Sequence, residues 1–317
     1  MHAERSCKLS FPVVGIVVAA ALWSTDASAF CRTRTVATPP DFDPAASCFR
    51  DGVALYHPSQ CLPYRLVTRA SPTLPNAVLS DVLARSFAEW TRPNAHCSPG
   101  ISTIELEPVD RERIVSYAAG QRGDNIVGFV SPWPHGGGQT LALATLTFSA
   151  ATGEIYDVDL EINQDVRWST SDSPTTDDYD LQSALTHEAG HVLAFAHSSD
   201  TNATMWASYN PGSIEMRSLE DDDMLAVCDA FPTRFSRTTD QGLVPATACQ
   251  LAPGAAGDGC GDAEIGHGCS VAAMGIRGIR GIRGGAVATA RTPASALGLL
   301  TVLAMFARRR GRRRIDG

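Results

Sequence analysis

The stretch that decides the fold is HEAGHVLAFAH, residues 187–197. Side chains four residues apart lie on one face of an α-helix, so His187 and His191 can direct their ring nitrogens at a common point. A continuing helix would carry His197 well over about 200° around the axis from His191, because each residue turns the helix by roughly 100°. The chain must therefore leave the helix before His197 if the three imidazoles are to converge.

Three histidines with a neighbouring carboxylate suit a hydrolytic zinc site. Three protein ligands leave the fourth position of a tetrahedral zinc open for water, which distinguishes a catalytic site from a closed structural one. Glu188 can act as general base toward a water that the metal activates. The leading hypothesis is therefore a zinc-dependent endopeptidase that forms no covalent intermediate, with metal ligands His187, His191 and His197 and the catalytic base Glu188.

The surrounding sequence predicts one α+β domain. Apolar residues at helical spacing predict a helix over residues 74–90 and a second that starts near Asp177 and Asp178 and runs into the motif. Strands are predicted over residues 63–67, 101–106 and 125–130, and residues 155–168 alternate like a half-buried strand that ends in a loop.

The motif and the residues after it resemble the metzincin metalloproteases, and most closely their matrixin branch. The metzincin pattern is HExxHxxGxxH followed by a methionine turn. In this chain HSSDTNATMWASY, residues 197–209, places Ser198 after the third histidine and Met205 at the turn. The resemblance implies a zincin fold: a twisted, mostly parallel five-stranded sheet with an antiparallel edge strand, an active-site helix and a C-terminal helix. By the same resemblance, residues 136–148 would form the edge strand and residues 218–227 the C-terminal helix, with its paired aspartates at Asp222 and Asp223.

The resemblance also implies how a peptide would bind. The matrixin edge strand pairs with an extended substrate, so that main-chain hydrogen bonds hold the peptide while pockets read alternate side chains. Met205 would form an apolar floor beneath the metal, and Tyr209 part of the wall of the primed-side pocket. The substrate backbone is expected against Leu141, Ala142, Leu143 and Ala144.

Two departures from the family pattern change the expected site. Ala194 replaces the glycine at which the chain leaves the helix, and a non-glycine residue at positive φ costs on the order of 1 kcal/mol. The histidines of the family's structural zinc are missing, so one zinc is expected. Calcium and a solvated acidic loop remain alternative interpretations of Asp157, Asp159, Glu161 and Asp165. Surface or loop positions are expected for His57, His96, His135 and His267.

The N-terminus indicates export. Arg5 and Lys8 precede an apolar run, and Ala-Ser-Ala at residues 27–29 has the small-x-small pattern of a signal peptidase site, so residues 1–29 are predicted to be a signal peptide. Residues 30–61 form a Cys-containing segment before the protease domain, which is placed at residues 62–232. No cysteine-switch motif precedes the domain, so this form of latency is not expected.

Nine cysteines are present, and removal of Cys7 with the signal leaves eight, for which disulfides in an oxidising compartment are the default. The sequence does not fix their pairing. A local pair of Cys48 with Cys61 is one guess among the alternatives.

The composition changes after residue 232. Residues 233–291 are rich in Gly and Ala, contain the repeat GIRGIRGIRGG, and are predicted to be a flexible linker. An apolar stretch, residues 292–307, precedes an arginine-rich cytoplasmic end, residues 308–317. With Gly268-Cys269 before it, this tail resembles the bacterial MYXO-CTERM sorting tails, in which Cys269 would be processed or attached. A simple membrane anchor is the alternative, so anchorage is transient or permanent.

The charge distribution excludes a nucleic-acid partner. Of the 26 Lys and Arg, two precede Phe30 and ten follow residue 269. Of the 34 Asp and Glu, two precede Phe30 and one follows residue 269. The segment between them therefore has a net charge near −17. The expected protein is thus an exported bacterial monomer, at the cell surface or secreted, whose partners are peptide or protein substrates and a tail-processing enzyme. The alternative function is a catalytically weak or inactive surface binding protein with a metzincin fold.

Overall fold

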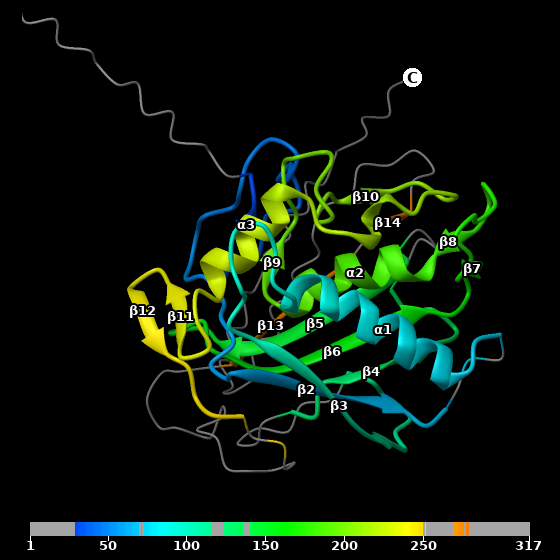
Figure 1. Cartoon of the computed structure of the whole chain (residues 1–317), viewed down its shortest axis with the longest axis horizontal. Helices are drawn as coiled ribbons and strands as arrows, with labels where there is room; N and C mark the ends of the chain where they lie inside the picture. Colours follow the sequence, from blue (N-terminus) through cyan, green and yellow to red (C-terminus); the bar gives the residue numbers. More distant parts are fainter. Residues whose placement is uncertain are drawn as a thin grey trace, which may run out of the picture.

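A computed structural model describes residues 29–69, 71, 73–115, 123–135, 140–249, 251, 269–275 and 277–278. Its centre is a six-stranded sheet. Helices α1 (Asn76–Thr91) and α2 (Leu181–Val192) pack against each other over one face of this sheet (Figure 1). The predicted α+β architecture is therefore confirmed.

The order of the sheet strands is β13-β5-β6-β4-β2-β3. Their bounds are β2 Cys61–Val67, β3 Ser102–Val109, β4 Ile126–Val130, β5 Ala142–Ser149, β6 Ile155–Asn163 and β13 Cys269–Met274. The pairs β2–β3, β2–β4 and β4–β6 are parallel, whereas β5 runs antiparallel to β6. These five strands match the predicted mostly parallel sheet with one antiparallel strand. Strand β13, which was not predicted, pairs with the outer side of β5, so β5 is not the edge strand that was expected.

The main core lies between the sheet and the two helices. Helix α1 contributes an apolar stripe that includes Leu83, Phe87 and Trp90, as its helical spacing predicts. The Trp90 indole stacks on Phe195 with ring centroids 5.2 Å apart, and its Nε1 donates a hydrogen bond to Thr186 O at 2.8 Å. Trp90 therefore ties α1 to the helix that carries the histidine motif.

Short elements surround this core. Strand β1 (Cys31–Arg32) pairs with β9 (Phe195–Ala196), β7 (Trp168–Ser169) with β8 (Tyr179–Asp180), and β10 (Ser208–Tyr209) with β14 (Arg277–Gly278). A 3-10 turn, η1 (Glu215–Arg217), precedes α3 (Asp221–Ala230), the predicted C-terminal helix. A hairpin of β11 (Ser236–Thr239) and β12 (Gly242–Pro245) follows α3.

Part of the range predicted as a linker is ordered against the domain. The hairpin lies within it, and Cys249 forms a disulfide with Cys61 at the start of β2. The other two disulfides join Cys31 to Cys48 and Cys97 to Cys228. The guess that Cys48 pairs with Cys61 is therefore wrong, because tertiary structure brings each to a different partner. Three disulfides suggest an oxidising compartment.

Several predicted segments lie outside the described residues: most of the signal peptide, the apolar stretch 292–307, the arginine-rich end and His267. Within the described part of the chain, we find no helix with the length and apolar character needed to cross a bilayer.

Candidate metal centre

Helix α2 begins at a buried carboxylate. Asp180 is its N-cap and accepts a hydrogen bond from Ser183 N at 2.8 Å, which satisfies one of the free amides of the first turn. Arg217 donates to both oxygens of Asp180, at 2.6 and 2.9 Å, and so balances a charge that is fully buried. Asp177 and Asp178 lie before the helix, so the predicted start was a few residues too early.

The helix ends where the third histidine requires it to end. Ala194 has a φ of 73°, which confirms the expected positive φ, and its N–H donates to His191 O at 2.9 Å. The chain then continues as β9, whose Phe195 and Ala196 pair with β1. This reversal brings His197 back toward α2.

The three predicted ligands converge on one point. The Nε2 atoms of His187 and His191 are 3.1 Å apart, and those of His191 and His197 are 3.2 Å apart. Ligand atoms of all three side chains lie within 4.8 Å of one another, and among the described residues they form the only such group of His, Cys, Asp or Glu. Tetrahedral zinc, with Zn–N distances of about 2.0–2.1 Å, separates its nitrogen ligands by roughly 3.3 Å, so the donor set fits this ion.

The second ring nitrogens explain why the Nε2 atoms are available. His187 Nδ1 lies 2.6 Å from Thr204 O, and His191 Nδ1 lies 2.8 Å from Phe195 O. A carbonyl oxygen only accepts, so each Nδ1 carries the proton and each Nε2 presents its lone pair. Burial lowers the pKa of His191 to about 4 and that of His187 well below its usual value. Neutral imidazoles are the form that binds metal.

Met205 and Asp223 stabilise the arrangement of the helix histidines. A Cβ at Gly190 would lie 2.2 Å from Met205 Sδ, so the glycine between the two helix histidines lets the methionine pack against α2. Asp223 accepts hydrogen bonds from Thr204 N at 2.7 Å and from Met205 N at 3.1 Å. Because Thr204 O contacts His187, this carboxylate fixes the turn that orients the first ligand.

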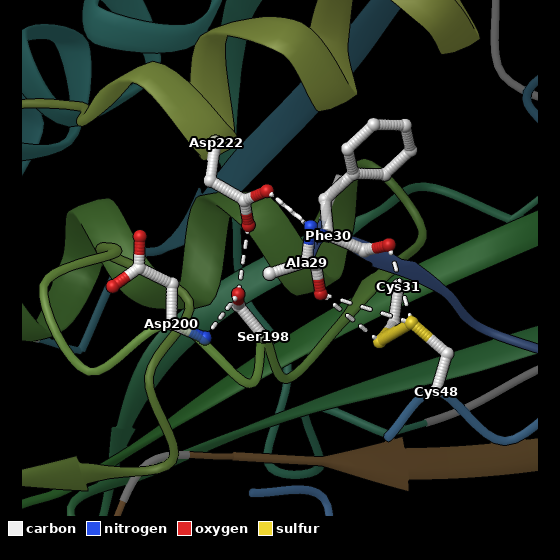
Figure 2. The surroundings of a disulfide bond; sticks show 7 residues. All are labelled: Ala29, Phe30, Cys31, Cys48, Ser198, Asp200 and Asp222. Carbon is white, nitrogen blue, oxygen red and sulfur yellow. Dashed lines mark hydrogen bonds between the residues drawn. A yellow bond between two sulfur atoms is a disulfide. The ribbon is translucent and has the colours of Figure 1, made fainter. Parts of the chain in front are cut away.

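The N-terminal segment is linked through Asp222 to Ser198, the residue after the third predicted ligand (Figure 2). Asp222 Oδ1 accepts from Ala29 N and Phe30 N, both at 2.8 Å, and its Oδ2 accepts from Ser198 Oγ at 2.7 Å. The Cys31–Cys48 disulfide anchors the same segment beside β9. Asp222 therefore links α3, the first described residues and the residue after His197.

The predicted pocket residues come together on both sides of α2. Leu141 and Tyr209 share a buried cluster with Ala184 of α2. The Tyr209 hydroxyl accepts from Asp180 N at 3.2 Å and donates to Ser213 O, and burial raises the pKa of Tyr209 to about 12. Ala142, Leu143 and Ala144 lie in β5, which contacts α2. Strand β5 and the Tyr209 segment thus both lie against α2.

A family model described as Matrixin matches residues 56–231, which is more than half of the chain and includes the three histidines, Met205, Tyr209 and Asp223. The chain belongs to the matrixin family. It is similar to interstitial collagenase A of Mus musculus, with 30% identity over 142 residues that cover 44% of this chain and 26% of that protein. Matrilysin of Homo sapiens is 33% identical over 122 residues, or 38% of this chain and 40% of matrilysin.

A plant relative matches over a longer range. Metalloendoproteinase 4-MMP of Arabidopsis thaliana is 26% identical over 230 residues, which cover 68% of this chain and 61% of that protein. The match thus spans less than half the length of the collagenase and of matrilysin, and less than two thirds of the plant protein.

The acidic residues considered for calcium do not form a cluster of three or more ligand atoms in the described part of this matrixin. Asp157 and Asp159 lie on β6 and accept from Asn125 N and Ile126 N, at 3.3 and 2.8 Å. Glu161 pairs with His135 at 2.6 Å, and Asp165 accepts from Ser131 Oγ and Trp133 N. Three of these carboxylates are buried rather than in a solvated loop, which corrects that alternative, and they fasten the loops around β4 to β6.

Sequence reasoning missed several supporting residues of the matrixin site. His57 lies in a loop, one of the two expected positions, but it is buried there, and its Nε2 lies 2.6 Å from Val192 O at the end of α2. The Arg217–Asp180 pair and the Tyr209–Asp180 contact were also not foreseen. An aspartate directly before an apolar helical run is the one local signal that could have identified Asp180.

Proposed function

We propose that this chain is a zinc-dependent endopeptidase. The observation that carries the proposal is the approach of three histidine Nε2 atoms, at 3.1 and 3.2 Å between neighbours, with Glu188 buried beside them in a matrixin domain. Relatives named as metalloproteinases support the same class of reaction.

His187, His191 and His197 would hold the ion. When bound, zinc lowers the pKa of water and polarises a carbonyl oxygen. Glu188 follows His187 on α2, and its carboxylate would accept a proton from the attacking water and pass it to the leaving amine. Thr204 O and Phe195 O keep the first two imidazoles in the tautomer that binds metal.

The substrate would be a peptide or protein in extended form. Its backbone would lie along β5 at Leu141 to Ala144, and a side chain would enter the space between Met205 and Tyr209. The net negative charge of the domain favours neutral or basic substrates. One zinc is proposed, and calcium is not needed for this assignment.

We further propose that the protein is exported, with residues 1–29 removed as a signal peptide and the C-terminal tail used for sorting or anchoring at a bacterial surface. The three disulfides support an oxidising compartment. The tail proposal rests on the sequence alone.

The test is to express the chain with its own N-terminal segment in an oxidising compartment and to measure bound zinc and cleavage of an unfolded protein such as casein. We expect one zinc and a cleavage rate that is low but measurable and is lost on chelation and in Glu188→Ala. Glu161→Gln is the matched control, because Glu161 is buried on β6 and its carboxylate pairs with His135, which is not one of the three converging histidines. Zinc without Glu188-dependent cleavage would instead support a binding protein, and folded protein without zinc would overturn the metal site.

A further inference from the structure

The C-terminal segment, defined here as residues 269–275 and 277–278, covers both sides of the proposed substrate site. Strand β13 runs antiparallel along β5, from Cys269 opposite Ser149 to Met274 opposite Ala144. Strand β14 then pairs in parallel with β10, where Gly278 lies opposite Tyr209 (Figure 1). One stretch of this chain thus contacts the edge strand and the pocket segment on which the proposed function depends.

The segment crosses from one side of the histidine helix to the other. Leu141, next to β5, and Tyr209 of β10 pack around Ala184 of α2. Met274 ends β13 and Arg277 begins β14. Three residue steps span at most about 11 Å of extended chain, so the end of β13 and the start of β14 lie no farther apart than this.

The contacts of the segment are close and largely buried. Ala272 and Met274 are each 4% exposed and belong to the main core cluster. Met274 Sδ lies 3.5 Å from Thr33 Oγ1, and Thr33 N donates to Ala194 O in the turn between the second and third ligands. The segment is therefore packed against the residues that shape the metal centre.

Gly275 shows how near the segment lies to the expected substrate positions. A Cβ on Gly275 would lie 2.0 Å from Ala142 O and 3.1 Å from Leu143 Cα. Only a residue without a side chain fits this approach. The backbone at Gly275 thus occupies space directly beside two of the four residues predicted to hold the substrate.

We propose that the C-terminal segment fills the substrate cleft of its own chain and keeps the protease latent until it is displaced or cut. The inference rests on the proposed function, because it assigns the edge of β5 to peptide binding. A free strand edge pairs with one partner strand at a time, so a substrate and β13 compete for the same main-chain groups. This latency needs no separate pro-domain and no cysteine switch.

The test uses two variants of the full chain that loosen the segment in different ways. Met274→Asp places a charge in its buried contact, whereas Gly275→Ala adds a Cβ that collides with Ala142 O. Leu243→Asp is the matched control, because Leu243 is 67% exposed on β12. Gly275 is not itself a core residue, so the second variant keeps the test decisive if Met274→Asp does not fold.

Two readouts are measured. Trypsin cleavage after Arg277, followed by mass spectrometry, reports release of β14 and needs neither zinc nor turnover. The second readout is the affinity for a peptide hydroxamate in a Glu188→Ala background, together with hydrolysis of a fluorogenic peptide when Glu188 is present. We expect both segment variants to be cut faster after Arg277 and to bind and hydrolyse at least about tenfold better, while Leu243→Asp behaves as wild type.

The outcomes separate this inference from the proposed function. Trypsin could cut the segment variants faster after Arg277, and these variants could bind the hydroxamate more tightly, while no form hydrolyses peptide. The segment then blocks the cleft, and the endopeptidase proposal fails. If trypsin cuts both variants faster after Arg277 but their affinity for the hydroxamate and their hydrolysis equal those of wild type, β13 is only a sixth structural strand. The inference is then overturned, while the endopeptidase proposal stands.

Discussion

This protein has two buried clusters of side chains of the types that bind metals, and the clusters differ in where their ligand atoms point. The histidines of α2 and His197 bring their Nε2 atoms to within 3.2 Å of a neighbour. On β6, Asp157, Asp159 and Glu161 are equally buried, but their oxygens are directed at the backbone of residues 125–126 and at His135.

The difference lies in where the hydrogen bonds go. Each helix histidine uses its Nδ1 for a backbone carbonyl and leaves Nε2 for a ligand. The β6 carboxylates use their oxygens to hold loops. Burial and a dense run of ligating residue types are therefore weak evidence for a metal site, and the direction of the remaining lone pairs decides between a metal centre and a structural cluster.

The largest contrast is expected in zinc content. His191→Ala removes the nitrogen that lies between the other two, so bound zinc should fall from about one per chain to near zero. Asp159→Asn should keep one zinc, because Asp159 lies on β6, accepts from Ile126 N and is not one of the three converging histidines. Elemental analysis after dialysis measures both. An equal loss of zinc in the two variants would contradict the assignment.

The next contrast is catalytic and compares two buried glutamates. Glu188→Gln should lower the initial rate on an unfolded substrate by roughly 10²–10⁴-fold while zinc is retained, which is the usual contribution of a general base. Glu161→Gln should leave the rate within a few-fold. Both are measured in the Gly275→Ala background, so that the C-terminal segment does not mask the difference. A similar loss in both would show that β6 takes part in the chemistry.

The acidic cluster makes its own prediction, because burial raises the pKa of Asp157 from 3.8 to about 6. The folded state then binds more protons than the unfolded chain between these values, so stability falls as the pH rises through this window. In Asp157→Asn, an amide that does not titrate replaces this carboxyl. The stability of the variant minus that of wild type, measured as the free energy of unfolding, should therefore rise by roughly 2–3 kcal/mol between pH 3.5 and pH 7. Urea denaturation at several pH values measures this, and a difference independent of pH would refute it.

The smallest effect is expected at Ala194, in the turn of the histidine cluster. Its φ of 73° is a conformation that glycine adopts more easily, so Ala194→Gly should stabilise the fold by about 1 kcal/mol or slightly less. The change in melting temperature measures it, with Ala203→Gly as a buried control. Destabilisation by Ala194→Gly would show that the strain is absent.

The parts predicted from the sequence are those specified by neighbours along the chain. Helical spacing predicted α1, period-two patterns predicted β2 and β6, and the spacing of His187, His191 and His197 predicted both the converging ligands and the chain reversal at Ala194. In each case one short stretch contains the whole signal.

The parts that were missed depend on partners far apart in sequence. Residues 269–274 are mostly small and lie in a glycine-rich range, so no local pattern indicates a strand, and their pairing with β5 exists only in three dimensions. The same reason explains Cys61–Cys249, with partners 188 residues apart, and the buried position of His57. Tertiary contacts fixed these features.

The Cys61–Cys249 disulfide turns almost the whole protease domain into a covalent ring. A single break in any loop between these cysteines opens the ring but leaves its two pieces joined, so an enzyme that nicks itself there keeps its parts together. Residues 269–278 follow the ring in sequence, so a cut shortly after Cys249 severs their backbone connection to it. The same disulfide thus keeps a cut protease domain in one piece, whereas it does not retain a C-terminal segment that has been cut off.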